Sequence, residues 1–533
     1  MRRRLTVGSV GLALLALAAT PARSTAAAER PRVHRAGVRI GEPGGPRTTP
    51  VPWLVRPGSD DRVAAAAHVS AAAPSRGGAP LVPAPVLPFD GVPEVVTLSP
   101  GDPTGALGVS YHLAAVNVQM NFYDRLGTKL FANPKRLRSL DTQLPAGVDD
   151  FDPKIFYDSY RQTFVLAFAS ASDTKSFLSL VVIPEGSEND PSQWCTVHMA
   201  GDQVTGNGKQ LADYPMLGFT EDRVTLTTNQ FDYTFAPSIG NFRYAQILSF
   251  RKGELYDCSV PVVHIKVFSR NQTKDPDGSR AFTISPAISI GGSPTNQWMV
   301  SIDFNGSNGK VILWRLRVVK GILRLDRTQV GKGPMSFPPW GRQCGGTGTR
   351  NPDTTRWDTG DLRVTSTFWD TDLGRLYATT SVAGNLGAGN PESLVRWWEI
   401  DPASRIVDSK ITRKGLVGVA GRDAAWGSVA TDGDGNLWVN YAQAGIAGTD
   451  ECLSAYTAVV HPGSTSASRV LLKAGDGRFE TGPGIERWGD YTAISRDPTD
   501  PTVMATYGQY PLDDGGGAPT RDWQQTISTI TDV

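Results

Sequence analysis

Four aspartates stand at or beside the start of short apolar runs that recur along the chain: Asp152, Asp213, Asp361 and Asp490. A pair of carboxyl groups can divide the work of general acid and of nucleophile or base, as in the hydrolysis of a glycosidic bond. Carboxylates that crowd together raise each other's pKa, which keeps one of them protonated as the acid. These aspartates are therefore the candidate catalytic residues.

Aromatic and basic residues accompany the four aspartates. Aromatic faces stack on the apolar side of a pyranose ring, and a guanidinium binds a carboxylate or an acidic sugar. The competing interpretation is structural, because an aspartate before a strand often caps backbone amides and a Trp or Tyr beside glycine commonly packs between sheets. The candidate substrate-binding residues are Tyr214, Arg363, Trp426, Arg487, Trp488 and Tyr491.

The loop Asp432-Gly433-Asp434-Gly435-Asn436 suggests a second type of site. Oxygen-bearing side chains at alternate positions of a glycine-containing loop are typical of calcium sites, so Asp432, Asp434 and Asn436 are candidate ligands of a structural calcium. The loop lacks the closing glutamate of an EF-hand and is also a plain Asp-Gly hairpin turn. No other cofactor is expected, since nucleophile-elbow, zinc-protease and phosphate-loop motifs do not occur.

These residues need a scaffold in which the starts of several strands meet. From residue 100 onward, short runs of aliphatic and aromatic residues end at Gly, Asp, Asn or Pro, and helical periodicity is almost absent. The pattern predicts strands, for example at residues 164–168, 178–183, 224–228, 298–304, 311–318, 376–380 and 437–441. Turn-forming residues between them, as at 372–374 and 434–436, predict hairpins.

A similar phrase recurs about seven times, roughly 45 to 75 residues apart. It consists of a polar or aromatic residue, often with a proline, then an alternating apolar strand, a turn and a second strand. Four-stranded propeller blades take about 40 to 50 residues each, and insertions lengthen them. We therefore predict an all-β fold, a six- or seven-bladed β-propeller, rather than a β-sandwich pair or a β-helix. In such a ring the starts of the innermost strands meet at one mouth of the central channel. The first copy begins at Tyr111, and the others begin at Asp152, Tyr214, Ser285, Asp361, Trp426 and Tyr491.

Two of these phrases, residues 150–158 and residues 487–498, resemble a broad family of secreted bacterial propeller proteins related to the sialidase-like superfamily. The resemblance spans roughly residues 100 to 533 and implies fold and export far more than a reaction. It does not imply sialidase activity. The Ser-x-Asp-x-Gly-x-x-Trp box has only a degenerate counterpart at residues 431–438, and the Arg-Ile-Pro phrase that supplies a carboxylate-binding arginine is missing.

The start of the chain is typical of an exported protein. Arg2, Arg3 and Arg4 precede an apolar stretch of about 15 residues, shorter than the ~20 that a bilayer requires, and Ala26-Ala27-Ala28 suits signal peptidase. We predict a signal peptide over residues 1–28, a Pro/Ala/Gly-rich linker or pro-segment over residues 29–99, and the propeller over residues 100–533. The Sec and twin-arginine routes are both open, and the expected location is extracellular or periplasmic.

Export places the four cysteines in an oxidising compartment, where disulfides persist. Of the three possible pairings, Cys195 with Cys258 and Cys344 with Cys452 joins sequence neighbours and closes the shorter loops, so we predict it. The chain has 53 basic and 52 acidic residues and no basic stripe, so a nucleic-acid partner is not expected. No membrane span is expected in the mature chain.

The leading hypothesis is a secreted, monomeric, carbohydrate-active propeller that acts as a glycoside hydrolase or polysaccharide lyase on an extracellular polysaccharide. The alternative is a noncatalytic carbohydrate- or protein-binding propeller with a role in adhesion. The two differ in one structural requirement. The hydrolase needs two carboxyl groups about 5 to 10 Å apart in an open pocket, whereas a binder can leave the channel plugged.

Overall fold

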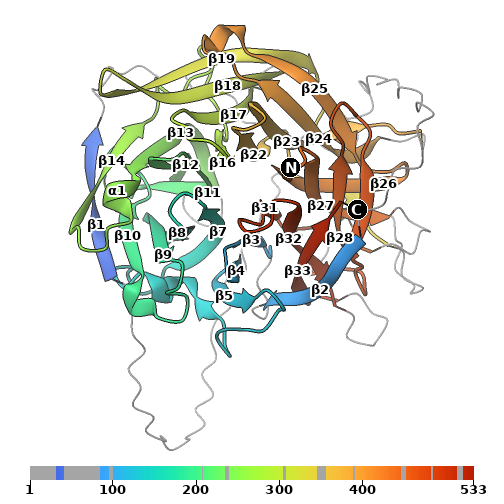
Figure 1. Ribbon diagram of the computed structural model, residues 1–533, viewed down its shortest axis with the longest axis horizontal. Helices are drawn as coiled ribbons and strands as arrows, with labels where there is room; N and C mark the ends of the chain where they lie inside the picture. Colours follow the sequence, from blue (N-terminus) through green and yellow to red (C-terminus); the bar gives the residue numbers. More distant parts are fainter. Residues whose placement is uncertain are drawn as a thin grey trace, which may run out of the picture.

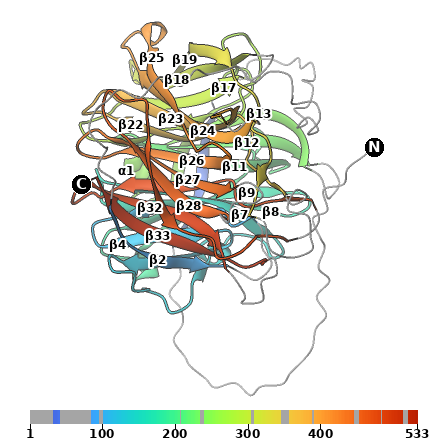
Figure 2. The same cartoon turned by 90° about the vertical axis from the view of Figure 1, so that its right-hand side faces the viewer.

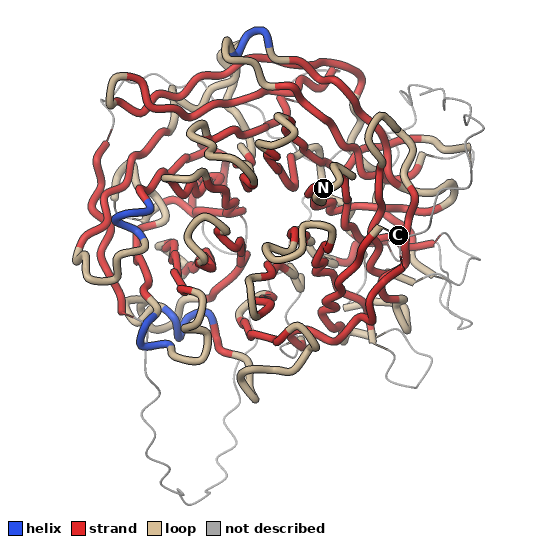
Figure 3. Tube along the Cα trace, viewed as in Figure 1, coloured by secondary structure: helices blue, strands red, loops and turns tan. Residues whose placement is uncertain are grey.

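The computed structural model describes residues 32–40, 84–94, 100–206, 208–233, 239–303, 308–344, 356–387, 391–445, 452–481, 484–512 and 520–532. Within these residues, seven four-stranded antiparallel blades form a ring around a central channel (Figure 1). Figure 3 shows that strands dominate and that the helical pieces are short, namely α1 (Lys252–Leu255), η2 (Leu137–Leu140), η3 (Pro191–Gln193) and η4 (Ile406–Asp408). The predicted all-β propeller is confirmed, with seven blades.

Each blade begins with its innermost strand and continues outward. Blade 1 contains β3 (Thr104–Leu107), β4 (Tyr111–Val116), β5 (Gln119–Asp124) and β6 (Lys135–Arg136), and blade 2 contains β7 (Asp149–Asp158), β8 (Thr163–Ala171), β9 (Ser176–Pro184) and β10 (Cys195–Ala200). Blade 3 contains β11 (Gln210–Phe219), β12 (Arg223–Tyr233), β13 (Ile239–Arg251) and β14 (Val262–Phe268), and blade 4 contains β15 (Ser285–Pro286), β17 (Gln297–Asp303), β18 (Asn308–Val319) and β19 (Ile322–Pro334). Blade 5 contains β22 (Val364–Asp370), β23 (Arg375–Gly384), β24 (Glu392–Asp401) and β25 (Lys410–Val417), and blade 6 contains β26 (Arg422–Thr431), β27 (Leu437–Gly445), β28 (Ser454–Val460) and β29 (Ser468–Lys473). Blade 7 contains β31 (Ala493–Arg496), β32 (Val503–Pro511), β33 (Trp523–Thr531) and β2 (Ala84–Pro93).

Strands outside the blades connect them. Beside blade 4, β16 (Ile288–Ile290) pairs in parallel with β11 and β22, and thus joins the inner strands of blades 3 and 5. A three-stranded sheet is formed by β20 (Gly341–Arg342), β21 (Arg356–Trp357) and β30 (Ile485–Glu486). Since β21 and β30 precede the inner-strand segments of blades 5 and 7, this sheet fixes the approach of the chain to both.

The ring closes through a strand from the N-terminal part of the chain. Strand β2 pairs antiparallel with β33 and is the outermost strand of blade 7. The propeller therefore starts upstream of residue 100, inside the stretch expected to be a linker. Strand β1 (Arg32–Ile40) pairs in parallel with β10 and β14, the outer strands of blades 2 and 3. The predicted signal peptide lies outside the described residues.

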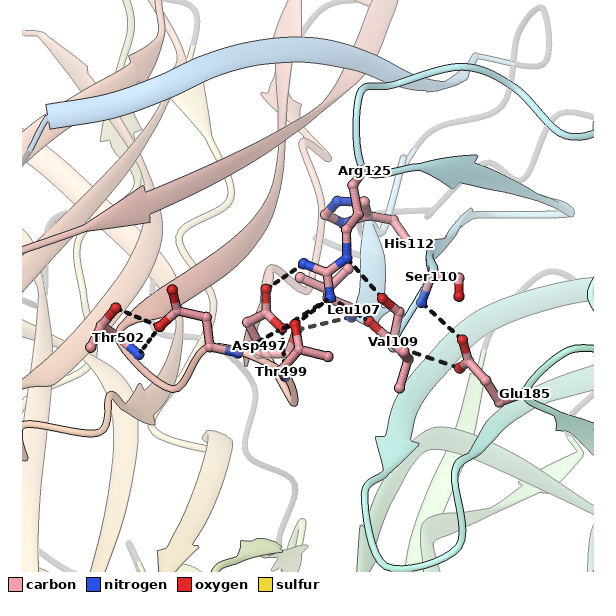
Figure 4. Close-up of polar contacts among 12 residues, drawn as sticks. Leu107, Val109, Ser110, His112, Arg125, Glu185, Asp497, Thr499 and Thr502 are labelled. Carbon is pink, nitrogen blue, oxygen red and sulfur yellow. Dashed lines mark hydrogen bonds and ion pairs between the residues drawn. The ribbon is translucent and has the colours of Figure 1, made fainter.

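A polar cluster binds blade 1 to both of its neighbours (Figure 4). The guanidinium of Arg125 donates to both carboxylate oxygens of Asp497 in blade 7 and to the backbone carbonyl of Val109 at 2.8 Å. On the opposite side, Glu185 of blade 2 accepts from the backbone amides of Val109 at 3.3 Å and Ser110 at 2.9 Å. One turn of blade 1 is thus held between the last blade and the second.

The core lies between adjacent blades. The middle strands have neighbouring blades on both faces, which explains why β8 and β27 are buried along almost their whole length. Figure 2 shows strands β26, β27 and β28 of blade 6 side by side across the thickness of the ring. In the described part of the chain, no helix is long and apolar enough to cross a membrane.

Both predicted disulfides are present. Cys195 lies in β10 of blade 2 and bonds to Cys258, which precedes β14 of blade 3. Cys344 follows β20 and bonds to Cys452, which precedes β28 of blade 6. The pairing predicted from loop length is confirmed, and each bond joins different parts of the ring.

Candidate functional site

Five of the seven inner strands contain, or follow within two residues, a residue in the left-handed backbone region. The φ angles are 51° at Asp102, 54° at Asp152 and Tyr214, 49° at Thr283 and 60° at Trp426. At Asp152, Tyr214 and Trp426 the pairing with the next strand shifts register, which marks a β-bulge. Bulges re-aim side chains, and strained residues gather at functional sites. The recurring sequence phrase is therefore this bulge, and it marks the mouth where a site is expected.

Aspartates from the first and last blades meet at this mouth. The carboxylate of Asp102 is fully buried and accepts hydrogen bonds from the backbone amide of Asp490 at 2.6 Å and from the side chain of Asn117 at 2.6 Å. The carbonyl oxygen of Asn117 in turn accepts from the backbone amide of Asp152 at 2.8 Å. Asn117 therefore bridges two carboxyl-bearing residues of blades 1 and 2.

Two tyrosines lie beneath the mouth and hold Asp152. Its carboxylate accepts from the hydroxyl of Tyr491 at 3.0 Å and from the backbone amide of Tyr214 at 3.2 Å. The two rings pack at a centroid distance of 4.7 Å, and the Tyr214 hydroxyl donates to the backbone carbonyl of Asp490 at 3.3 Å. With Met216 they form a small buried apolar layer that underlies the mouth.

Three carboxyl groups of this mouth, those of Asp102, Asp152 and Asp213, have a pKa above that of a free aspartate. Burial, assisted by Asp490, raises the pKa of Asp102 to about 7. Burial also raises the pKa of Asp152 well above its ordinary value, and Asp102, Asp213 and Asp490 add to the rise. The pKa of Asp213 is raised by burial and by Asp490, against the opposing effect of Arg363 and Arg487. The mouth therefore brings Asp102 together with three of the four predicted aspartates, Asp152, Asp213 and Asp490, and their charges influence one another.

The fourth predicted aspartate has a different role. Asp361 forms a two-pronged ion pair with Arg363, with both N–O distances at 2.8 Å. The Arg363 guanidinium also lies 4.4 Å from the ring centroid of Tyr214, which places it against the tyrosine layer. Asp361 therefore acts as the counter-ion that orients Arg363.

Arg487 is the accessible cation of the mouth. Its side chain is 45% exposed and donates to the Asp490 carboxylate at 2.7 Å. The negative charge of Asp490 raises the pKa of Arg487 above its ordinary range. Arg487 directly follows β30, so the small three-stranded sheet positions it at the mouth.

The structure corrects the predicted role of the aromatic residues. Tyr214, Trp426, Trp488 and Tyr491 are each at most 3% exposed, so none offers a free ring face to a sugar. The Trp426 indole donates to the backbone carbonyl of Asp358 at 2.9 Å and belongs to the same core cluster as Trp488. The two tryptophans pack between blades, and the two tyrosines support the carboxylates from below.

The candidate calcium loop is a self-contained hairpin turn. One carboxylate oxygen of Asp432 accepts from the backbone amides of Asp434 and Asn436, and the other accepts from the Asn436 side chain and the Trp438 indole, all at 2.8–3.0 Å. The turn between β26 and β27 is thereby complete without an ion. Among the residues described, no group of three or more His, Cys, Asp or Glu could hold a metal.

Sequence reasoning missed Asp102, Asn117 and Lys154. Asp102-Pro103 repeats the dipeptide Asp152-Pro153 and has the same left-handed backbone, so the motif itself was a usable signal. Lys154 lies two residues after Asp152, and its ammonium is 3.3 Å from the ring centroid of Tyr491. Asn117 follows β4 and has no counterpart in the repeated phrase.

No protein-family model matches the chain, and no curated protein matches it. Among solved structures, it is similar to a protein of unknown function from Dyadobacter fermentans, with a TM-score of 0.39 and 12% identity over 72% of this chain and 94% of that chain. It is also similar to the Penicillium chrysogenum α-L-arabinanase complexed with arabinobiose, with a TM-score of 0.37 and 11% identity over 84% of this chain and 99% of that chain. A third is the Trypanosoma rangeli sialidase in complex with sialic acid, with a TM-score of 0.36 and 10% identity over 77% of this chain and 57% of that chain. The propeller assignment rests on the strand topology, and these similarities carry no information on the reaction.

Proposed function

We propose that this protein is a secreted glycoside hydrolase that acts on an extracellular polysaccharide at the mouth formed by Asp102, Asp152, Asp213 and Asp490. The observation that carries the proposal is the meeting of mutually interacting carboxyl groups from different blades beside an accessible arginine. Glycoside hydrolysis needs one carboxylic acid with a raised pKa and one ionised carboxylate. Export is supported by the two disulfides.

The two partly exposed aspartates take the catalytic roles in this proposal. Asp213 is the general acid, because its pKa is raised and it is less enclosed than Asp102 and Asp152. Asp490 is the nucleophile or base, because its carboxylate is 16% exposed and is paired with the accessible cation Arg487 at 2.7 Å. Arg487 and Arg363 favour a substrate that carries negative charge.

A hydrolase fits the mouth better than a polysaccharide lyase. A lyase would need a tyrosine or histidine as base, but burial raises the pKa of Tyr214 and Tyr491 well above the ordinary value. The adjacent pair Tyr111 and His112 is no substitute, since His112 is fully buried, binds the Tyr507 hydroxyl at 2.9 Å and has its pKa lowered by burial to about 4. The proposal therefore commits to hydrolysis.

The test is a screen of the purified mature protein against neutral and acidic glycans, with detection of newly formed reducing ends. We expect product from wild type, at least a hundredfold less from Asp213→Asn and Asp490→Asn, and wild-type turnover from Asp408→Asn. Asp408 lies in η4 and its side chain is 54% exposed, so it is a matched control for loss of one carboxylate. Equal turnover by wild type and Asp213→Asn would contradict the assignment of the acid.

A noncatalytic carbohydrate-binding propeller is the second candidate, and one observation favours it. Asp102 and Asp152 are buried and already accept hydrogen bonds from neighbouring residues, which is what a purely structural cluster would show. If wild type and both variants retain the same glycans without forming product, the protein is a binder.

A further inference from the structure

A chamber of about 410 Å³ occupies the central channel on the inner side of the tyrosine layer. Residues from all seven inner-strand segments line it, and Met216 of the buried apolar layer forms part of its wall. Its other end is lined by Asp372, Gly433 and Pro501, which belong to turns after the inner strands of blades 5, 6 and 7. The volume falls within the range of small-molecule sites, about 300–1,000 Å³. None of the four aspartates of the mouth lines the chamber, but Lys154 of its wall lies over the ring of Tyr491, which holds Asp152.

Each of the seven inner-strand segments places one residue in a ring around the chamber wall. Two positions after each left-handed residue stand Thr104, Lys154, Met216, Ser285 and Ser428, and Thr365 and Thr492 line the same wall from blades 5 and 7. Five of these seven residues carry hydroxyls and one carries a positive charge. This ring of residues therefore adds polar groups, including a single lysine, to a wall that also contains apolar side chains such as Leu107, Phe156 and Ile288.

Most wall hydroxyls are used to join blades. Thr365 donates to the backbone carbonyl of Gly427 at 2.6 Å, and Thr492 donates to that of Trp426 at 2.6 Å. Two hydroxyls differ: Ser285 and Thr367 are 0% and 3% exposed, line the chamber and have no hydrogen-bond partner. A buried hydroxyl without a partner costs about 1–3 kcal/mol, so these two groups mark a place for a ligand that supplies one.

Lys154 is also buried without a hydrogen-bond acceptor, and its side chain can carry a full positive charge. Its side chain is 9% exposed, its ammonium lies over the Tyr491 ring, and no acceptor in the described residues binds it. Burial lowers the pKa of Lys154 to about 7, although Asp152, Asp102 and Asp490 oppose the shift. A buried ammonium group is stabilised by an anionic acceptor.

The remaining charges of the chamber wall lie toward its other end and are engaged. Asp497 binds Arg125, Asp372 accepts from the backbone amide of Gly292 at 3.1 Å, and Arg496 donates to the backbone carbonyl of Asp432 at 3.0 Å. Among the charged groups of the described wall, Lys154 is therefore the one without a hydrogen-bonded or ion-paired partner.

We propose that the channel chamber binds a small organic acid, with its carboxylate on Lys154 and its hydroxyl or carbonyl oxygens on Ser285 and Thr367. The two oxygen-bearing contacts favour a polyhydroxylated acid of the size of one sugar unit over acetate. This proposal does not rest on the hydrolase function proposed at the mouth.

Isothermal titration of the full mature protein with D-glucuronate, acetate and D-glucose tests the proposal. D-Glucuronate is expected to bind, acetate more weakly because it lacks the hydroxyls, and D-glucose not measurably because it lacks the carboxylate. Lys154→Met is expected to weaken D-glucuronate binding about tenfold to a hundredfold, as for loss of a charge-assisted hydrogen bond. Equal affinity for D-glucose, or no binding of D-glucuronate by wild type, would overturn the proposal.

A pair of threonine variants separates the chamber from the mouth and from failure to fold. Thr367→Val removes a chamber hydroxyl, whereas Thr225→Val removes an equally buried, unpartnered hydroxyl in β12 that does not line the chamber. Thr367→Val is expected to weaken D-glucuronate binding several-fold and Thr225→Val to leave it unchanged. If both variants bind D-glucuronate like wild type, the ligand does not contact Thr367. The proposal then fails even if Lys154→Met weakens binding.

Discussion

The carboxylate of Asp102 accepts a hydrogen bond at 2.6 Å from the backbone amide of Asp490, a residue 388 positions away in the sequence. Asp102 lies two residues before the inner strand of blade 1, and Asp490 lies three residues before that of blade 7. The aspartate cluster therefore lies on the joint at which the ring closes. The contacts that close the propeller therefore also assemble the candidate site.

Asp102 makes the stability of the fold depend on pH. Its pKa is about 7 in the folded protein against about 3.9 in an unfolded chain, so the folded state holds the proton more tightly. The stabilisation is complete below about pH 4 and is lost as the pH rises through about 7. We expect wild type to lose more unfolding free energy than Asp102→Asn between about pH 5 and about pH 8, measured by urea denaturation. Parallel pH profiles for the two proteins would contradict this prediction, and Asp408→Asn is the control.

Arg125 is expected to stabilise the closed ring. Its partner Asp497 has a side chain only 2% exposed, so Arg125→Ala leaves a buried carboxylate without its cation. We predict a loss of about 2–4 kcal/mol of unfolding free energy, measured by urea denaturation. Arg405→Ala removes an exposed ion pair with Asp408, at 78% and 54% side-chain exposure, and should cost less than about 0.5 kcal/mol. Similar losses in the two variants would show that Arg125 has no special part in closure.

The disulfide between blades 2 and 3 should stabilise the fold through the unfolded chain. Cys195 and Cys258 close a loop with a sequence separation of 63, for which the chain-entropy relation gives about 4 kcal/mol. We expect the Cys195→Ser, Cys258→Ser double variant to lose unfolding free energy of this order. The comparison is made by chemical denaturation under non-reducing conditions, and an unchanged midpoint would rule out the bond as a stabilising element.

The packing role of Trp426 can be tested at a neighbouring glycine. Gly360 has a φ of +83°, and a methyl group there would lie 2.7 Å from the Trp426 ring. We expect Gly360→Ala to lower the unfolding free energy by about 1–3 kcal/mol because of both the backbone strain and the clash. Gly253→Ala is the control, since nothing lies within 4 Å of its added methyl. A neutral Gly360→Ala variant would mean that the indole is free to move and that its buried position is not required.

Much of the fold could be predicted from the recurring phrase, because inner strands that contain the same β-bulge need similar residues at it. Asp152-Pro153, Tyr214-Pro215 and Trp426-Gly427 were recognisable for this reason. Strand β2 was not, since Pro85, Pro88 and Pro93 made its segment resemble a linker. Proline removes a ladder donor and is tolerated in an edge strand, which is the position of β2 in blade 7.

The site was only partly predictable because contacts between distant segments decide it. The sequence identified Asp152, Asp213 and Asp490 as carboxyl groups that could meet. Their separate roles in the proposed reaction depend on how deeply the fold buries each one. The same holds for Trp488, whose burial at 2% exposure depends on the packing of other blades. The pairing of Asn117 with Asp102 required the folded ring, since nothing in the repeated phrase marks a residue after β4.

The most direct test of the hydrolase proposal is the number of new reducing ends formed per molecule of wild type and of Asp213→Asn on the best substrate of the glycan screen. Retention of the same glycan is measured in parallel for both proteins. The proposal predicts many turnovers by wild type and at least a hundredfold fewer by Asp213→Asn, with glycan retention preserved. Glycan retention without product in either protein would contradict it and identify the propeller as a binding protein.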